Sequence, residues 1–176
     1  METPAILLRK TPWSETSFIL TWLTASFGTI RTGARGAARP GSAFAGKLDF
    51  LFHTEIAFTL SRRGDLHSLR EVTVLAPFNA THAGSAGFYL AAYFAEISGA
   101  VSPAMQPAPE IFDLLARGLA YLQKTPANEK ALHHFERELC RILGVHDHLG
   151  DVDAVQALSS LCGGIPASRL AALKFL

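Results

Sequence analysis

Residues 17–34 read SFILTWLTASFGTIRTGA, and their pattern indicates the fold of the first half of the chain. Its first eight residues alternate between two faces, which is the period-two pattern of a strand. One face carries Phe18, Leu20 and Trp22, and the other carries Ile19, Thr21 and Leu23. A tight connection through Ser26-Phe27-Gly28 leads into the next run, because Gly28 can adopt turn conformations that other residues avoid. The stretch predicts two adjacent β-strands.

Similar short runs lie on both sides of this pair and are separated by turn signals. Arg62-Arg63-Gly64-Asp65 has the composition of a hairpin turn, with Gly64 free to take a positive φ. Five short strands within about 75 residues fit a small closed barrel, either the five-stranded oligonucleotide-binding (OB) fold or an SH3-like barrel. The predicted strands are 4–10, 17–24, 29–34, 48–60 and 66–75.

After Pro77 the apolar residues recur with a helical period. Thr125 is the expected N-cap of a third helix, with Pro126 at its first position and Gly144 just past its end. The helix residues expected in the core are Leu90, Tyr93, Phe94, Ile97, Val101, Ile111, Leu114, Leu115, Leu119, Leu122, Leu132, Phe135, Leu139, Ile142, Leu143, Val152, Val155, Leu158, Cys162, Leu170 and Leu173. The sequence thus predicts an α+β protein, with an N-terminal five-stranded OB-fold β-barrel (1–77) followed by a C-terminal α-helical bundle (78–176).

The composition is that of a globular protein, with 49% hydrophobic and 18% charged residues. No window has the roughly 18 apolar residues of a membrane span, and the N-terminus lacks the features of a secretion signal, so we expect a cytoplasmic protein. The net charge of +1 conceals an asymmetry. Residues 1–78 carry nine Lys and Arg against six Asp and Glu, whereas residues 79–176 carry seven against nine. We therefore expect a polyanion to bind the first half.

Signatures of catalysis are absent. The sequence has no G-x-S-x-G, Walker A, H-E-x-x-H or paired C-x-x-C motif, and its two cysteines are interpreted as small buried hydrophobic residues. Glu136 and Glu138 are expected to be surface carboxylates. His146 and His148 could bind a transition metal, but solvated loop histidines are the favoured interpretation. We therefore expect no enzyme, no cofactor and no metal.

The segment from Arg31 to Lys47 is the most informative one for function. Its basic residues are separated by Gly, Ala, Ser and Pro, which leave the guanidinium groups open to a phosphate chain. Trp13 and Phe44 could offer ring faces to a base. The alternative is a solvated basic loop with Phe44 in the core. The predicted DNA-binding residues are Arg9, Lys10, Arg31, Arg35, Arg39, Lys47, Arg62 and Arg63.

In their order and spacing, these motifs resemble the DNA repair protein RecO family. The resemblance covers residues 4–144. It is carried by an opening strand, a Pro-aromatic-x-Glu-Thr motif, a Gly-rich basic loop, a leucine-led strand, a Gly-x-Leu hairpin and a central helix. These correspond to Ala5 to Arg9, Pro12-Trp13-Ser14-Glu15-Thr16, Gly28 to Ala37, Gly46 to Phe50, Arg63 to Leu69, and Leu132 to Gly144.

The resemblance implies an OB-fold domain followed by a helical domain, and binding and annealing of single-stranded DNA. It further implies a role as a mediator of recombinational repair that loads RecA with RecR, and association with the nucleoid. Contact with the C-terminal tail of single-stranded-DNA-binding protein is also implied, for which Phe135 and Arg141 are the candidate residues.

The chain departs from the family pattern in several places. It lacks the cysteine zinc site that many members have after the central helix, and it ends early. His133 and His134 stand where a basic pair is common, which predicts a weaker or pH-sensitive contact with the acidic tail. The basic loop is also thin in charge, with Ala37, Ala38, Gly41 and Ala43 at positions that are often basic.

Two other functions stay open. The thin loop favours an OB-fold protein-interaction module with little DNA affinity of its own, and the histidines leave room for a metal-dependent enzyme.

Overall fold

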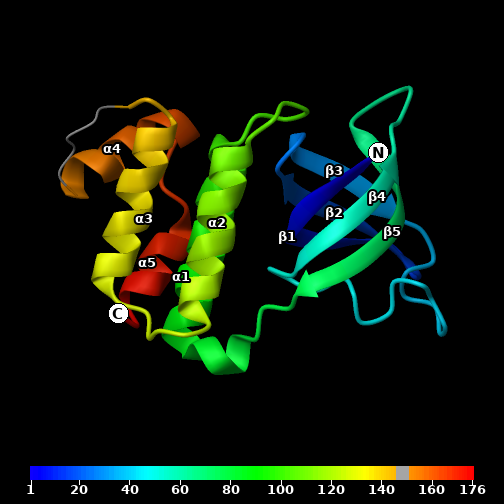
Figure 1. Cartoon of the computed structure of the whole chain (residues 1–176), viewed down its shortest axis with the longest axis horizontal. Coiled ribbons are helices and arrows are strands. Elements are labelled where there is room, and N and C mark those ends of the chain that lie inside the picture. Colours follow the sequence, from blue (N-terminus) through cyan, green and yellow to red (C-terminus); the bar gives the residue numbers. More distant parts are fainter. Residues whose placement is uncertain (146–150) are drawn as a thin grey trace. The chain divides into compact units, whose positions relative to one another are not determined.

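A computed structural model describes residues 1–145 and 151–176, and in this part of the chain five strands precede five helices (Figure 1). The strands are β1 (Glu2–Ser14), β2 (Ser17–Thr24), β3 (Gly28–Ala34), β4 (His53–Thr59) and β5 (Leu66–Ala76). The helices are α1 (Ala80–Val101), α2 (Pro109–Leu122), α3 (Glu129–Ile142), α4 (Asp151–Cys162) and α5 (Ala167–Leu173). This order confirms the predicted α+β class.

The five strands close into a barrel in the order β1-β2-β3-β5-β4, with β4 pairing back to β1 (Figure 1). β3 and β5 pair in parallel, whereas the other neighbours are antiparallel. This is the strand order of an OB fold, and it decides between the two barrel types that the sequence left open.

The inward faces of the strands fill the barrel. Leu20 and Trp22, which the alternation of β2 assigned to one face, are fully buried, and Phe18 of the same face packs against this cluster. The Trp22 indole Nε1–H donates to Thr32 Oγ1 at 2.8 Å, so the polar atom of this buried ring is satisfied. The rest of the cluster consists of Ala5, Leu7, Ile30, Ala34, Ala37, Leu48, Ile56, Phe58, Leu69 and Val72. The side chains on the outward faces of the strands are therefore the ones available for binding.

Two strands differ from their predicted ranges by more than one residue. β1 extends further at both ends, and β4 begins at His53 rather than at residue 48. Leu51 adopts a φ of 65°, in the left-handed region, so it does not have the extended backbone of a strand residue. The Leu51 N–H still donates to Leu7 O at 2.8 Å, so the segment before β4 is held to β1 as a turn.

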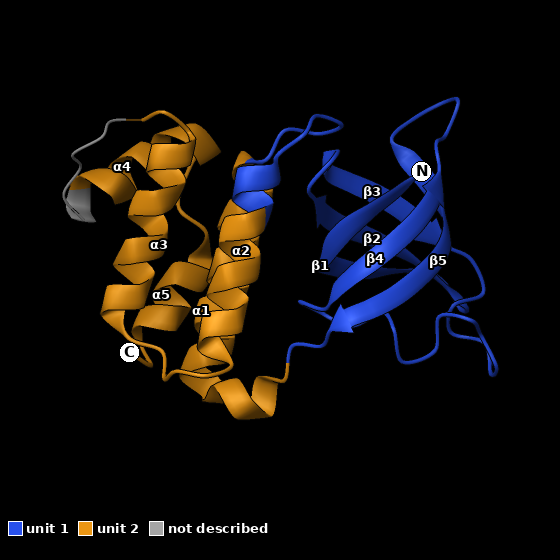
Figure 2. Cartoon of the chain, in the orientation of Figure 1, with its two compact units in different colours: residues 1–78, 102–112 blue, residues 79–101, 113–176 orange. Residues whose placement is uncertain are grey.

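The chain divides into two compact units (Figure 2). The first consists of residues 1–78 and 102–112, and the second of residues 79–101 and 113–176. The segment between α1 and α2 belongs to the barrel unit, where Thr29 N–H donates to Pro103 O at 3.1 Å. A Cβ at Gly28 would lie 2.0 Å from that carbonyl oxygen, so this contact requires glycine. That 1–77 and 78–176 are separate domains stays a prediction.

The second unit buries most of the predicted apolar positions of its helices. The N-cap of α3, however, is Asn128 rather than Thr125, because the Asn128 side chain accepts a hydrogen bond from Ala131 N–H at 2.9 Å. Leu170 of α5, expected in the core, is 66% exposed, and Ala172 is buried instead. Among the described residues, none of the helices has the length and hydropathy of a membrane-spanning segment.

A buried ionic cluster joins α1, α3 and α5. Glu136 was expected at the surface but is fully buried. Its carboxylate accepts hydrogen bonds from Tyr93 Oη at 2.7 Å and from Arg169 Nε at 2.6 Å. Burial, together with the charge of Glu136, raises the pKa of Tyr93, so the phenol stays protonated and donates. The expectation for Glu136 was wrong because partners on two distant helices compensate its charge.

Candidate nucleic-acid interface

Strand register brings two of the predicted arginines onto one outer surface of the barrel. Arg9 of β1 pairs with Thr21 of β2, and Thr21 pairs with Arg31 of β3. Directly paired residues point to the same side of a sheet, and both arginines are exposed. Because neighbouring strands lie about 4.8 Å apart, the two Cα atoms are separated by about 10 Å across the sheet.

β3 continues this surface toward the following loop. Residues 31 and 33 share one side of β3, since the intervening Thr32 is buried in the barrel. Arg35 follows in the turn after β3, and its guanidinium lies over the Trp13 ring, which itself lies against Gly33. Arg39 follows in a turn in which its N–H donates to Gly36 O at 3.1 Å. Neither Arg35 nor Arg39 forms an ion pair with any described residue. We call the four residues Arg9, Arg31, Arg35 and Arg39 the arginine face.

A cavity of about 440 Å³ opens on this face beside the β1–β2 hairpin. Trp13 is 47% exposed, and the Arg35 Cζ lies 5.9 Å from the centre of its ring, within the range of a cation–π contact. The lining residues are Trp13, Ser14, Thr16, Ser17, Arg35, Gly36 and Arg39. The cavity therefore combines an exposed ring with two guanidinium groups, the side chains that bind single-stranded nucleic acids.

Arg31 has an acidic partner. Its Nη1 donates to Asp65 Oδ2 at 2.8 Å, with side chains 47% and 74% exposed. This hydrogen bond and the charge of Arg31 hold the pKa of Asp65 below its usual value, so the carboxylate is ionised at neutral pH. Arg62 and Arg63 are exposed in the same β4–β5 connection. The β4–β5 connection therefore carries two exposed cations, Arg62 and Arg63, and the Asp65 carboxylate, which would compete with a phosphate for Arg31.

Three other predicted residues, Lys10, Lys47 and Phe44, are less free than the arginine face. Lys10 Nζ donates to Leu48 O at 3.0 Å and lies 4.5 Å from the centre of the Phe18 ring. Lys47 is partly buried. Phe44 is partly buried and packs against the barrel core, as the alternative interpretation had it. Lys10 therefore fastens the loop before β4 to β1 in addition to contributing charge.

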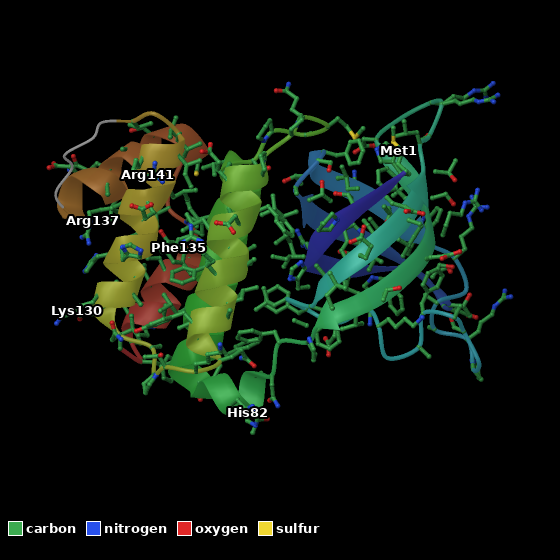
Figure 3. All side chains as sticks on the ribbon, in the orientation of Figure 1. Met1, His82, Lys130, Phe135, Arg137 and Arg141 are labelled. Carbon is green, nitrogen blue, oxygen red and sulfur yellow. The ribbon has the colours of Figure 1, made fainter. Side chains whose placement is uncertain are left out.

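The second unit contains a larger cavity, of about 920 Å³, between α2 and α3. Phe135 forms part of its wall and lies on the side of α3 that faces α2 (Figure 3). The Phe135 ring stacks on Phe94 with centres 3.8 Å apart. A Cβ at Gly118 of α2 would lie 3.1 Å from Phe94 and 3.3 Å from Phe135, so glycine gives both rings room. The other lining residues are Leu114, Arg117, Tyr121, Asn128, Glu129, Lys130, Ala131 and His134.

Arg141, the second residue predicted for partner binding, does not line this cavity. Its guanidinium donates to Glu138 Oε2 from Nε and from Nη2, both at 3.1 Å. Arg141 and Phe135 are therefore not brought together in one cavity, and both stay predictions as partner contacts.

The histidines considered for metal binding, His146 and His148, lie outside the described residues. Elsewhere in the described chain, His, Cys, Asp and Glu form no group of three or more that could hold a metal ion. Cys140 is buried and Cys162 is half-buried. Burial raises the pKa of both thiols, so they stay protonated at neutral pH.

Sequence reasoning missed the residues that complete the two cavities. Ser14, Thr16 and Ser17 lie at the hairpin between two strands that were predicted, so their closeness to Trp13 could have been inferred from the short turn. The pairing of Arg31 with Asp65 joins residues 34 positions apart, and nothing in the sequence indicates it.

Comparison with known proteins agrees with this barrel. The family model described as Recombination protein O N terminal matches residues 1–78. The DNA repair protein RecO of Anaeromyxobacter dehalogenans is 32% identical over 145 residues, which cover 82% of this chain and 57% of that protein. The chain belongs to the RecO family.

Further RecO proteins extend the match. The DNA repair protein RecO of Xanthomonas campestris pv. campestris is 33% identical over 141 residues, covering 78% of this chain and 56% of the relative. That of Exiguobacterium sibiricum is 27% identical over 171 residues, covering 93% and 68%. The chain thus spans just over half the length of the first two of these RecO relatives.

Proposed function

We propose that this chain acts in recombinational DNA repair by binding single-stranded DNA and annealing complementary strands, as a mediator that loads RecA together with RecR. The observation that carries the proposal is the arginine face, where four exposed guanidinium groups share one outer side of an OB-fold barrel. Its relatives bear the name DNA repair protein RecO, which supports the same role.

The arginine face would act through charge alone. Guanidinium groups bind phosphates without reading the base sequence, and each contact releases counterions from the strand. A strand whose phosphates are neutralised on one side repels a complementary strand less, which favours annealing. No bond is made or broken in this process, so the proposal assigns no catalytic residue, no metal and no cofactor.

The cavity beside Phe135 supports contact with the acidic C-terminal tail of single-stranded-DNA-binding protein. Its wall is apolar at Phe94, Leu114 and Phe135, and Lys130 stands at the same cavity. Apolar side chains of an acidic tail would enter, while the tail's carboxylates would meet the cation. Association with RecR and a cytoplasmic, nucleoid-associated location are proposed with the family role.

A protein-interaction barrel with little DNA affinity of its own is the second candidate. It is favoured by the partners that some predicted cations already have. Arg31 is paired with Asp65, and Lys10 donates to the Leu48 carbonyl oxygen. If such contacts persist beside DNA, fewer cations meet phosphates.

Titration of the full chain with a labelled thymidine oligomer separates the two candidates. If about four arginines contact phosphates, each contributing roughly 0.7 to the slope of log K against log salt, affinity falls about fifty-fold between about 50 and 200 mM salt. Undetectable binding at low salt, with a RecR complex that still forms, would favour the protein-interaction module. A marked preference among base sequences would contradict backbone recognition.

A further inference from the structure

We infer that the cavity bounded by Trp13, Arg35 and Arg39 is a nucleotide pocket that takes one unpaired base and its neighbouring phosphate. The inference rests on the proposed function, because it assigns the position of one nucleotide within the bound strand. It goes further because phosphate contacts alone do not distinguish an unpaired base from a paired one. The pocket would allow the barrel to distinguish an unpaired base from a paired one.

Trp13 provides the surface for the base. Among the described residues of the barrel unit, the other aromatic rings are buried or half-buried, whereas Trp13 is 47% exposed. A Cβ at Gly33 would come within 3.2 Å of the Trp13 ring carbon Cζ3, so the ring rests directly on the backbone of β3. A base that stacks on this supported ring removes apolar surface from water and gains ring–ring contact.

The guanidinium group of Arg35 leaves the ring accessible. Its Cζ stands 5.9 Å from the ring centre, whereas groups in direct contact approach to about 3.5–4.0 Å. A base held between the two groups needs two stacking spacings of about 3.4 Å each, roughly an ångström more than the present separation. Arg35 is exposed and forms no ion pair with any described residue, so its side chain can move by this amount.

The turn after β3 brings the second guanidinium group to the pocket. Gly36 has a φ of 67°, and Arg39 Cδ would lie 3.4 Å from a Cβ there, so the stem of Arg39 runs over the glycine. Gly36 N–H donates to Ser17 Oγ at 3.2 Å, and Ala38 N–H donates to Thr16 O at 3.0 Å. The turn and the β1–β2 hairpin are therefore bonded to each other, which forms the pocket before DNA arrives.

The size and charge of the pocket fit one nucleotide. Its volume of about 440 Å³ lies within the roughly 300–1,000 Å³ of small-molecule sites. Both charged lining residues are cationic, and Glu15 at the hairpin tip does not line the cavity. A duplex could fill the pocket only by unpairing and flipping a base, whereas a single strand has bases ready to stack. Since every base has a ring face, the pocket would accept all four.

The test uses the whole 176-residue chain and two single strands of about 15 nucleotides, a length that one OB fold can cover. One strand is oligothymidine, and the other is an abasic deoxyribose-phosphate strand with the same phosphates and no bases. The variants are Trp13→Ala, Trp13→Phe and Arg35→Ala. Affinity is measured by anisotropy, and tryptophan emission is followed in parallel. The chain has two tryptophans, and the second, Trp22, is fully buried, so quenching by DNA reports on Trp13.

We expect Trp13→Ala to weaken oligothymidine binding roughly tenfold, the order expected for loss of one base–aromatic stack, and to leave abasic binding unchanged. Trp13→Phe retains most of the affinity and removes the quenching, while Arg35→Ala weakens both strands. If Trp13→Ala lowers the affinity for both strands equally, or for neither, the nucleotide pocket is refuted while the proposed function stands. A wild-type chain that binds neither strand would overturn both.

Discussion

Replacing Asp65 by Asn should strengthen the binding of single-stranded DNA. In the free protein the Asp65 carboxylate accepts a hydrogen bond from Arg31 at 2.8 Å, so a phosphate that approaches Arg31 must displace or share it. Because the pKa of Asp65 is held low by Arg31, the competitor is fully charged at neutral pH. Asparagine keeps the shape of the side chain and removes the charge.

Because the wild-type Arg31 shares its charge between Asp65 and a phosphate, the upper limit of the gain is one full phosphate contact. Each contact on a single strand adds about 0.7 to the salt slope, which at about 0.1 M salt corresponds to roughly fivefold in affinity. Both partners are well exposed, so the folded state should lose little with this pair, and the melting temperature should stay close to that of the wild type. The assay is the oligothymidine titration over a series of salt concentrations.

Asp113→Asn is the matched control. Asp113 accepts a hydrogen bond from Arg117 at 2.7 Å, and this pair is also exposed, but it lies on α2 in the helical unit. The net-charge change is the same, so any general charge effect appears in both variants. If Asp65→Asn leaves affinity and salt slope unchanged, or if Asp113→Asn raises them equally, Arg31 does not meet phosphate as described.

Three further predictions concern the core, the pH dependence and the helical cavity. Arg169→Met should destabilise the helical unit by about 3–5 kcal/mol in urea denaturation, since it leaves the fully buried Glu136 without its cation; a loss below about 1 kcal/mol would contradict this. Burial lowers the pKa of His67 and His53 below 6.5, so the stability of the barrel should be complete above that pH and decline as pH falls through the folded pKa values. His67→Phe should reduce the loss of barrel stability at low pH. An unchanged dependence of stability on pH would contradict the contribution assigned to His67. Lys130→Glu should weaken an acidic tail peptide about tenfold more than Arg141→Glu in calorimetry, because only Lys130 lines the cavity; the reverse order would place the partner elsewhere on α3.

The fold was predictable where local pattern decides it. The alternation in β2 correctly groups Leu20 and Trp22 on one face, and the helical period identifies the buried faces of α1 and α3. The cap of α3 was not predictable in the same way, since Thr125 and Asn128 are both good N-cap residues. Asn128 is the N-cap because the backbone enters the helix there, and the point of entry depends on the packing of α3.

Non-local contacts account for most of what the sequence could not indicate. The parallel pairing of β3 with β5 identifies the barrel type, but it joins segments that share no sequence signal. The same holds for Glu136, whose burial depends on Arg169, 33 positions away. Trp13 and Phe44 were equivalent candidates for stacking, and the fold separates them by exposing one and packing the other on the core.

The proposed function requires that the arginine face hold the phosphate backbone of a single strand. The most direct test is the salt dependence of binding by the triple variant Arg9→Ala/Arg31→Ala/Arg35→Ala. We predict a salt slope reduced by about two and a similar loss of affinity for strands of any base sequence. An unchanged slope, or a loss confined to one base sequence, would contradict the account.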